Sequence, residues 1–181
     1  MNAFVTGATG YVGFSVAHAL RRAGYRVFGL TRDPGKAHRL ARHEIRPVIG
    51  SMQQPETFRA AVVESHVLVH AARATDGNPA ALDAATVEAM IDWSSVSAGA
   101  KTLIYTSTVW VHGDTHGSEY SEADPLDPAG SVAWRISVEE TVLNARGVNG
   151  SVIRPGLVYG ESGGWTGLWF AGAAGGAGTG A

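Results

Sequence analysis

The segment TGATGYVG at residues 6–13 constrains the fold of this chain more than any other. It follows a short apolar run at residues 3–5 and precedes a segment in which Val12, Val16 and Leu20 recur every four residues. This order predicts a strand, a glycine-rich turn and an amphipathic helix, which is the context that a dinucleotide fingerprint requires. The first backbone N–H groups of such a helix are free to bind phosphate. We therefore expect residues 6–13 to bind the pyrophosphate of a dinucleotide.

Each glycine of this segment has its own expected role. Gly7 permits the tight turn, Gly10 lets the main chain approach the pyrophosphate, and Gly13 lets the helix pack closely on the strand. A loop that merely turns the chain is the alternative, and the agreement of position and context disfavours it. The other loop residues that we assign to cofactor binding are Thr9, Tyr11 and Val12.

Composition excludes several classes of function. A length of 181 residues suits one α/β domain, alone or with a fragment of a second, and a hydrophobic content of 45% is ample for a core. A net charge of −2 argues against nucleic acid or an anionic membrane as the main partner. The chain has no cysteine, which excludes disulfides and thiolate chemistry. No apolar run approaches membrane-spanning length and no signal peptide precedes the first strand, so we expect a cytoplasmic protein.

Histidine spacing raises the question of a metal site. His112 and His116 have the four-residue spacing of ligands on one helix face, but Gly113 and Gly117 beside them predict a loop. We therefore expect no metal site.

Short apolar runs alternate with helical patterns along the chain. Helices are expected at residues 55–64, 79–98 and 132–146, with a polar loop at 113–131. This alternation predicts an α/β fold of the Rossmann type, a doubly wound parallel sheet. The expected strands are residues 2–6, 25–31, 45–49, 67–71, 101–106 and 151–154.

Residues 1–160 resemble the short-chain dehydrogenase/reductase superfamily, in its extended or atypical NAD-dependent epimerase/dehydratase branch. The resemblance rests on TGATGYVG, on HAAR at residues 70–73 and on RPGLVYG at residues 154–160. It implies that residues 1–160 form an NAD(P)-binding Rossmann domain. It also implies that Ala71, Ala72 and Arg73 lie over the cofactor and that the backbone near Pro155 lies on the nicotinamide side.

The end of the second expected strand bears on the choice between NAD and NADP. An NAD site places a carboxylate there to accept from the ribose 2′-OH, but this chain has Thr31 followed by Arg32. A guanidinium can pair with a 2′-phosphate, so we expect NADP rather than NAD. Two alternatives remain: Asp33 could serve an NAD ribose, or Arg32 could be solvated before a turn at residues 34–35.

The resemblance also places the adenine site after the third strand. The family usually has Gly-Asp there, and its carboxylate binds the adenine amino group. This chain has Gly50 followed by Ser51 and Met52, which we assign to the adenine end of the site. Ser51 lacks the carboxylate, which puts the adenine contact in doubt.

Hydroxyl residues end the fifth expected strand. Counting back five residues from Gly113 places Thr108 at the family's catalytic Ser/Thr, which hydrogen-bonds the substrate oxygen, and Thr106 beside the cofactor. The alternative is that these hydroxyls satisfy local backbone groups.

The family's catalytic pair, Tyr-x-x-x-Lys on the following helix, has no counterpart here. The aligned residues are Trp134 and Val138, which can neither transfer a proton nor supply a charge. Arg135 adjoins this position and could contact substrate or cofactor, but it cannot donate a proton at neutral pH. The ordinary proton relay of the family is therefore missing.

Three hypotheses follow. The first is an NADP-dependent oxidoreductase or epimerase that acts on a small carbonyl or hydroxyl substrate, with a homodimer as the candidate assembly and with water or His112 replacing the tyrosine. The second is a non-catalytic redox sensor resembling the nitrogen-repressor-type regulators of the superfamily, and the third is an inactive cofactor-domain fragment. Residues 161–181 are rich in Gly and Ala, where the resemblance implies the start of a substrate lobe. We expect that lobe to be truncated or missing.

Overall fold

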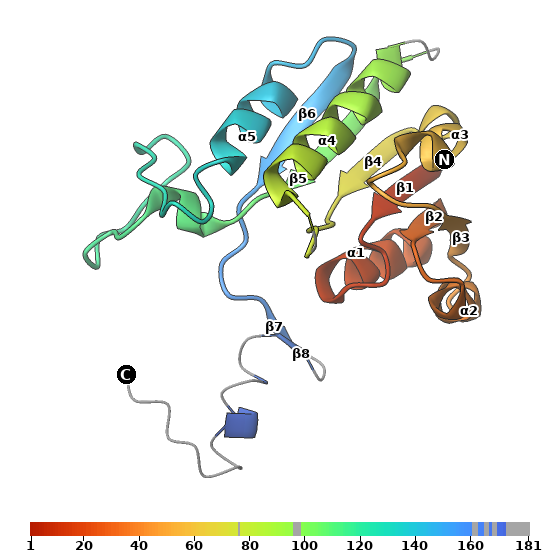
Figure 1. Cartoon of the computed structure of the whole chain (residues 1–181), viewed down its shortest axis with the longest axis horizontal. Helices are drawn as coiled ribbons and strands as arrows, with labels where there is room; N and C mark the ends of the chain where they lie inside the picture. Colours follow the sequence, from red (N-terminus) through yellow and green to blue (C-terminus); the bar gives the residue numbers. More distant parts are fainter. Residues whose placement is uncertain (76, 96–98, 161–162, 165–166, 168–169, 173–181) are drawn as a thin grey trace.

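The computed structural model describes residues 1–181 except 76, 96–98, 161–162, 165–166, 168–169 and 173–181. Six strands form one parallel sheet in the order β3-β2-β1-β4-β5-β6 (Figure 1). The chain crosses from one edge of the sheet back to its centre between β3 and β4, so that β1 and β4 are neighbours. This is the strand order of a Rossmann fold, and it confirms the predicted fold class. The strands are β1 (Asn2–Thr6), β2 (Arg26–Thr31), β3 (Arg46–Ile49), β4 (Val67–His70), β5 (Lys101–Thr106) and β6 (Val148–Ile153).

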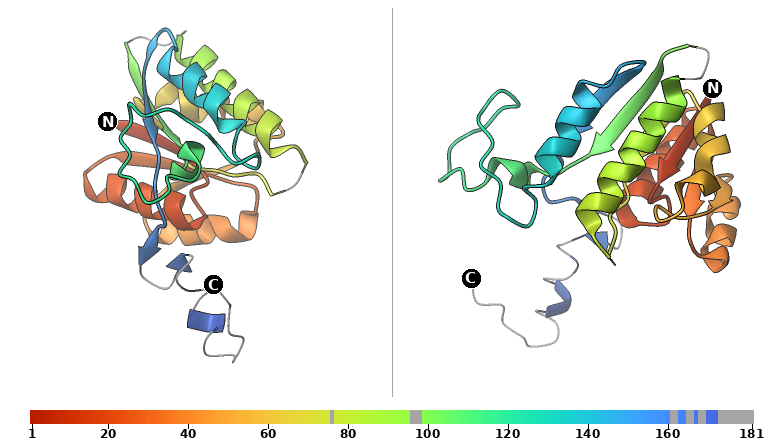
Figure 2. Two further views of the ribbon diagram at one scale, coloured as in Figure 1. Left: turned by 90° about the vertical axis from the view of Figure 1, so that its left-hand side faces the viewer. Right: turned by 45° about the horizontal axis from the view of Figure 1, so that its top comes forward.

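Helices cover the two faces of the sheet in sequence order (Figures 1 and 2). Helices α1 (Tyr11–Arg22) and α2 (Pro34–Arg42) lie on one face, against β1, β2 and β3. On the other face lie α3 (Arg59–Glu64), α4 (Pro79–Ser95) and α5 (Arg135–Leu143). The remaining elements are the 3₁₀ turns η1 (Pro55–Phe58) and η2 (Val109–His112) and the short strands β7 (Tyr159–Gly160) and β8 (Gly163–Gly164).

The central strand separates two hydrophobic cores. Phe4 points toward α3 and α4, where its ring stacks on Phe58 at 5.5 Å between centroids, and Phe58 in turn meets Trp93 edge-on. Val5 points to the opposite face and packs in the core beneath α1 and α2. Because β1 is buried on both faces, its residues read as one apolar run, which made this strand predictable.

Two expectations about helices are corrected by the structure. The helix expected at 132–146 is shorter, because residues 131–134 form turns and α5 begins only at Arg135. Residues 34–35 are the first turn of helix α2 and not an isolated turn. The carboxylate of Asp33 caps this helix by accepting from the Gly35 N–H at 2.8 Å, and proline suits the first helical position.

Candidate functional site

A cleft of about 450 Å³ opens at the carboxyl edge of the sheet, beside the glycine loop. It contains residues from the ends of β1 and β2, from the segment after β3 and from the segment after β4. In a doubly wound fold this edge is where ligands bind. The cleft brings together nine of the residues predicted to bind the cofactor: Gly7, Thr9, Gly10, Arg32, Ser51, Met52, Ala71, Ala72 and Arg73.

The three loop glycines differ in what surrounds them. A Cβ at Gly7, whose φ is +66°, would lie 2.5 Å from the Ala71 carbonyl oxygen, and a Cβ at Gly13 would lie 2.2 Å from the Gly7 carbonyl oxygen. A Cβ at Gly10 would meet only the Gly7 oxygen, at 3.2 Å. Gly7 and Gly13 are therefore required by backbone packing. Gly10 lines the cleft, where the missing side chain leaves room for a ligand.

The start of α1 is open to an anion. Gly10 occupies its N-cap position without a side chain to accept from the backbone N–H groups of the first turn. Unpaired N–H groups and the positive end of the helix dipole together form an anion site. The loop geometry thus suits a pyrophosphate.

Positive side chains line the cleft from two of its sides. Arg32 and Lys36 line it from the β2–α2 region and Arg73 lines it from the segment after β4. None of the described residues that line the cleft is a carboxylate. Asp33 is absent from the lining because its carboxylate caps α2. Thr31 is also occupied, since its Oγ1 accepts from the Asp33 N–H at 3.2 Å.

The other predicted cofactor residues do not line this cleft. Gly13 and Val12 lie inside α1. The Tyr11 hydroxyl donates to the Gly160 carbonyl at 2.9 Å, which brings β7 against the start of α1. The Pro155 carbonyl accepts from the Val109 N–H at 3.1 Å.

The hydroxyl of Thr108 satisfies a local backbone group, which is the structural alternative that the sequence left open. Its Oγ1 accepts from the Trp110 N–H at 3.3 Å and so caps η2. The hydroxyl proton of Thr108 remains able to donate to a ligand. His112, at the end of η2, has its Nε2 3.3 Å from Nη1 of Arg154. Because a guanidinium only donates, this nitrogen of His112 accepts and carries no proton to transfer.

The positions of the missing catalytic pair are occupied by structural side chains. Trp134 stands just before α5 and its indole N–H donates to the Ser131 carbonyl at 3.2 Å. Val138 is 2% exposed and packs in the core beneath α4 and α5. A lysine at position 138 would place its side chain in that core, where burying an unpaired ammonium is costly. The two lysines of the chain do not replace it, because Lys36 lies on α2 and Lys101 lies at the amino end of β5.

Lys101 has a structural role at that far edge. Its Nζ donates to the carbonyls of Val62, Val63 and Ser65 at 2.6–2.7 Å, which satisfies the end of α3. Burial lowers the pKa of Lys101, and the three carbonyls favour the ammonium form.

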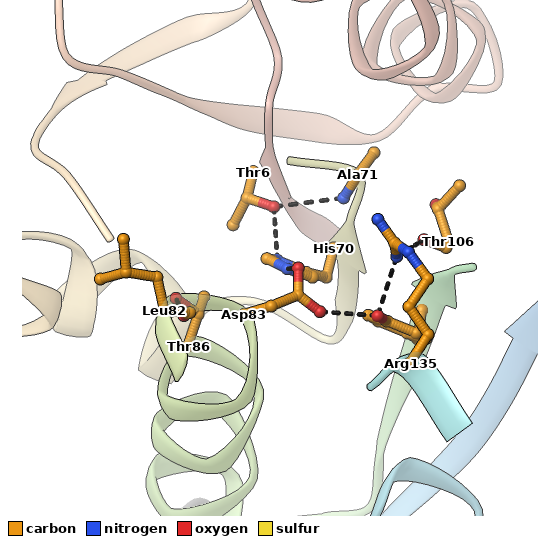
Figure 3. A network of polar contacts seen from close by, with 9 residues as sticks. Thr6, His70, Ala71, Leu82, Asp83, Thr86, Thr106 and Arg135 are labelled. Atoms are coloured by element: carbon orange, nitrogen blue, oxygen red, sulfur yellow. Dashed lines mark hydrogen bonds and ion pairs between the residues drawn. The ribbon is translucent and has the colours of Figure 1, made fainter. Parts of the chain in front are cut away.

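A buried polar network lies directly below the carboxyl edge (Figure 3). Thr6 Oγ1 lies 2.8 Å from His70 Nδ1, and His70 Nε2 lies 3.0 Å from Asp83 Oδ1. The Tyr105 hydroxyl donates to Asp83 Oδ2 at 2.6 Å and accepts from Nη1 of Arg135 at 2.9 Å. The network therefore joins β1, β4, α4, β5 and α5 through side chains that are at most 7% exposed.

Both ends of this network reach the candidate site. The Ala71 N–H donates to Thr6 Oγ1 at 3.2 Å, and Ala71 lines the cleft. Nη1 of Arg135 also donates to the Thr106 carbonyl, at 3.2 Å, at the end of β5. The network thus connects the two halves of the carboxyl edge.

The network itself is not a catalytic centre. Burial and the charge of Asp83 raise the pKa of Tyr105, so its hydroxyl keeps its proton and cannot replace the missing tyrosine. Thr6, His70 and Asp83 have the order of a nucleophilic triad, hydroxyl to imidazole to carboxylate. All three are at most 1% exposed, so no substrate reaches Thr6.

A second polar chain fixes α5 to β6. Glu139, 2% exposed on α5, accepts from Nε and Nη2 of Arg154 at 3.1 and 2.6 Å, and the hydroxyl of Ser107 donates to it. This ion pair gives Arg154 a structural role.

The part of the chain that the structure describes contains neither a metal-binding cluster nor a membrane-spanning helix. No three His, Cys, Asp or Glu side chains lie close enough together to hold a metal ion. None of the described helices is long and apolar enough to cross a membrane.

Comparison with known proteins agrees with the geometry. The curated relatives include a 4-hydroxy-2-methyl-3-oxo-4-farnesyl-3,4-dihydroquinoline-1-oxide ketoreductase from Stigmatella aurantiaca, 29% identical over 171 residues. That match covers 88% of this chain and 51% of the relative, so the chain spans about half the length of the curated relatives it matches.

Solved structures show the same fold. A dTDP-glucose 4,6-dehydratase from Bacillus anthracis in complex with NAD superposes with a TM-score of 0.73 at 19% identity, over 97% of this chain and 62% of that one. An NADPH-dependent quinone oxidoreductase from Escherichia coli in complex with NADPH gives 0.68 at 22% identity, over 97% and 53%. The sequence model of the NAD dependent epimerase/dehydratase family matches residues 3–172, and the chain belongs to this family.

Proposed function

We propose that this chain is the NADP-binding part of an oxidoreductase or epimerase that acts on a small carbonyl or hydroxyl substrate. The observation that carries the NADP preference is the β2 side of the cleft, where Arg32 and Lys36 stand and Asp33 is used as a helix cap. A 2′-phosphate is stabilised by such cations, whereas an unphosphorylated ribose is usually recognised by a carboxylate.

The change Arg32→Ala is expected to weaken NADPH binding more than about tenfold and NADH binding by much less, since a charge-assisted contact contributes about 1.5–3 kcal/mol. Titration of each cofactor by its fluorescence measures the two affinities. Arg42→Ala, at the exposed carboxyl end of α2 and outside the cleft, is the matched control. Equal losses for NADPH and NADH would refute the assignment of Arg32 to the phosphate.

Hydride transfer is the chemistry that a bound nicotinamide supplies. The protein would contribute binding and orientation: the glycine loop holds the pyrophosphate, and the free hydroxyl proton of Thr108 donates to the substrate oxygen. The donor that completes the reaction would be water, because the indole N–H of Trp134 is not acidic and the Nε2 of His112 accepts from Arg154.

A non-catalytic NADP-binding sensor is the second candidate. The observation that favours it is the pair of side chains at the catalytic positions, an indole hydrogen-bonded to its own turn and a valine packed in the core. This arrangement retains a cofactor cleft but lacks a proton relay.

Turnover separates the two candidates. We expect slow or absent NADPH oxidation with a panel of aldehydes and ketones, because loss of general acid catalysis typically costs about 10²–10⁴-fold. NADPH oxidation is followed by absorbance, with Thr108→Ala and Trp134→Ala as paired variants. Activity that survives Trp134→Ala and disappears with Thr108→Ala would establish the enzyme. NADPH binding without any turnover would favour the sensor.

A further inference from the structure

We propose that Arg135 holds the ribose of the nicotinamide half of the dinucleotide, in the place where related proteins use the lysine that this chain lacks. This inference rests on the proposed function and adds a specific binding residue to it. Four properties of Arg135 carry it: its place on the carboxyl edge, the support of its guanidinium, its remaining donors and its chemistry.

The place follows from the orientation of the cleft. Arg32 and Ser51 mark the adenosine end, after β2 and β3, and the glycine loop lies between that end and β4. A dinucleotide that crosses the loop therefore brings its nicotinamide half over the ends of β4 and β5. The guanidinium of Arg135 lies there, bonded to the Thr106 carbonyl at the end of β5, and Figure 3 shows it beside Thr106 on the side toward Ala71.

The support of the guanidinium is unusually complete for a side chain at a sheet edge. The Tyr105 hydroxyl accepts from Nη1 and donates to the carboxylate of Asp83. The buried positive charge therefore has a negative charge two hydrogen bonds away. The ring of Trp134 lies 4.5 Å from the guanidinium carbon, which adds a cation–π contact. A group fixed in this way loses little conformational entropy when a ligand binds.

Part of the guanidinium is left for a ligand. Both hydrogen bonds that Arg135 makes with the described residues use Nη1. Nε and Nη2 have no hydrogen-bond partner among the described residues, and they are not fully shielded from solvent. Arg135 thus combines a fixed position with N–H donors that are accessible at the carboxyl edge.

The chemistry of these donors selects the ligand group. Ribose hydroxyls can accept from N–H groups, and a guanidinium offers such donors in a rigid, planar arrangement. It stays protonated at any working pH, so Arg135 binds and orients without transferring a proton. This supplies the anchoring function of the absent lysine, but not its influence on a catalytic tyrosine.

The experiment compares two ligands that share the adenosine half. NADPH contains the nicotinamide half, with its phosphate, ribose and ring, and 2′,5′-ADP lacks it, so the ratio of their dissociation constants reports on that half and not on the adenosine half. For Arg135→Met we expect the NADPH affinity to fall about tenfold or more and the 2′,5′-ADP affinity to change less than about twofold. Both are measured by calorimetry on the same preparation, so a misfolded fraction lowers the number of sites and not the ratio.

Arg154→Met removes a half-buried arginine whose hydrogen bonds go to Glu139 and His112, outside the cleft, and should leave the ratio unchanged. Where Arg135→Met does not fold, Arg135→Lys provides the same measurement, because the shorter ammonium loses the paired donors and should shift the ratio in the same direction. An unchanged ratio in the Arg135 variants, with both ligands bound by the unmodified protein, would overturn the role of Arg135 alone. Failure of the unmodified protein to bind either ligand would overturn the proposed function and this inference together.

Discussion

Replacing Gly13 by alanine is expected to destabilise the fold strongly, whereas replacing Gly10 by valine is expected to abolish dinucleotide binding in a folded protein. A Cβ at Gly13 would lie 2.2 Å from the Gly7 carbonyl oxygen, which is backbone and cannot rotate away. The helix would have to move off β1, at a cost of about 3 kcal/mol or more. At Gly10 the nearest atom is 3.2 Å away and the added side chain extends into the cleft.

Urea unfolding and NADPH titration separate these two effects. Gly13→Ala should lower the free energy of unfolding strongly, and Gly10→Val should keep the far-UV spectrum and unfolding midpoint while losing the cofactor. Gly24→Ala tests the sensitivity of the assay at a glycine with no atom within 4 Å of its Cβ position, where only the positive φ of 89° opposes a side chain. Retained binding in Gly10→Val would show that the loop does not hold phosphate.

The sheet was predictable because its signals are local. Most of the parallel strands contain a short apolar run, and β1 and β5 end where the sequence indicates. Strand β6 begins at Val148, before the expected residue 151, because Asn149 and Gly150 interrupt its apolar pattern. The glycine loop was predictable for the same reason, since a tight turn between strand and helix leaves its pattern in eight consecutive residues. Helix α2 was missed although its signal was present, because Asp33 and Pro34 also occur together in turns.

The polar network was not predictable, because its members are far apart in sequence. Thr6 and His70 are 64 residues apart, and Tyr105 and Arg135 are 30 apart. Hydrophobic periodicity gives no indication that a histidine, an aspartate and an arginine will share one buried chain. The resemblance drew attention to Arg135 only as a neighbour of the missing tyrosine. The members of the network became neighbours only through the order of the strands, in which β1, β4 and β5 lie side by side.

The network is also expected to contribute strongly to stability, and this contribution depends on the presence of both Asp83 and Arg135. In Asp83→Ala, His70 and Tyr105 each lose the carboxylate oxygen that accepts their hydrogen bond, and the guanidinium of Arg135 loses the negative charge on the far side of Tyr105. A buried polar group that loses its partner costs about 1–3 kcal/mol, and Asp83→Ala leaves both His70 and Tyr105 in that state. We therefore expect Asp83→Ala to be among the most destabilising single changes in this chain.

A double-mutant cycle with Arg135 tests whether the cost arises from the unpaired charge. Arg135→Met removes the positive end of the network, so the combination of Asp83→Ala with Arg135→Met should be clearly more stable than the sum of the two single losses predicts. Urea unfolding at neutral pH gives all four free energies. The exposed pair Arg26 and Glu64, 3.4 Å apart at the surface, is the matched control and should show coupling of less than about 1 kcal/mol. Strict additivity at Asp83 and Arg135 would mean that Tyr105 does not transmit the charge interaction, and that the guanidinium is held at the carboxyl edge by the Thr106 carbonyl and the Trp134 ring instead.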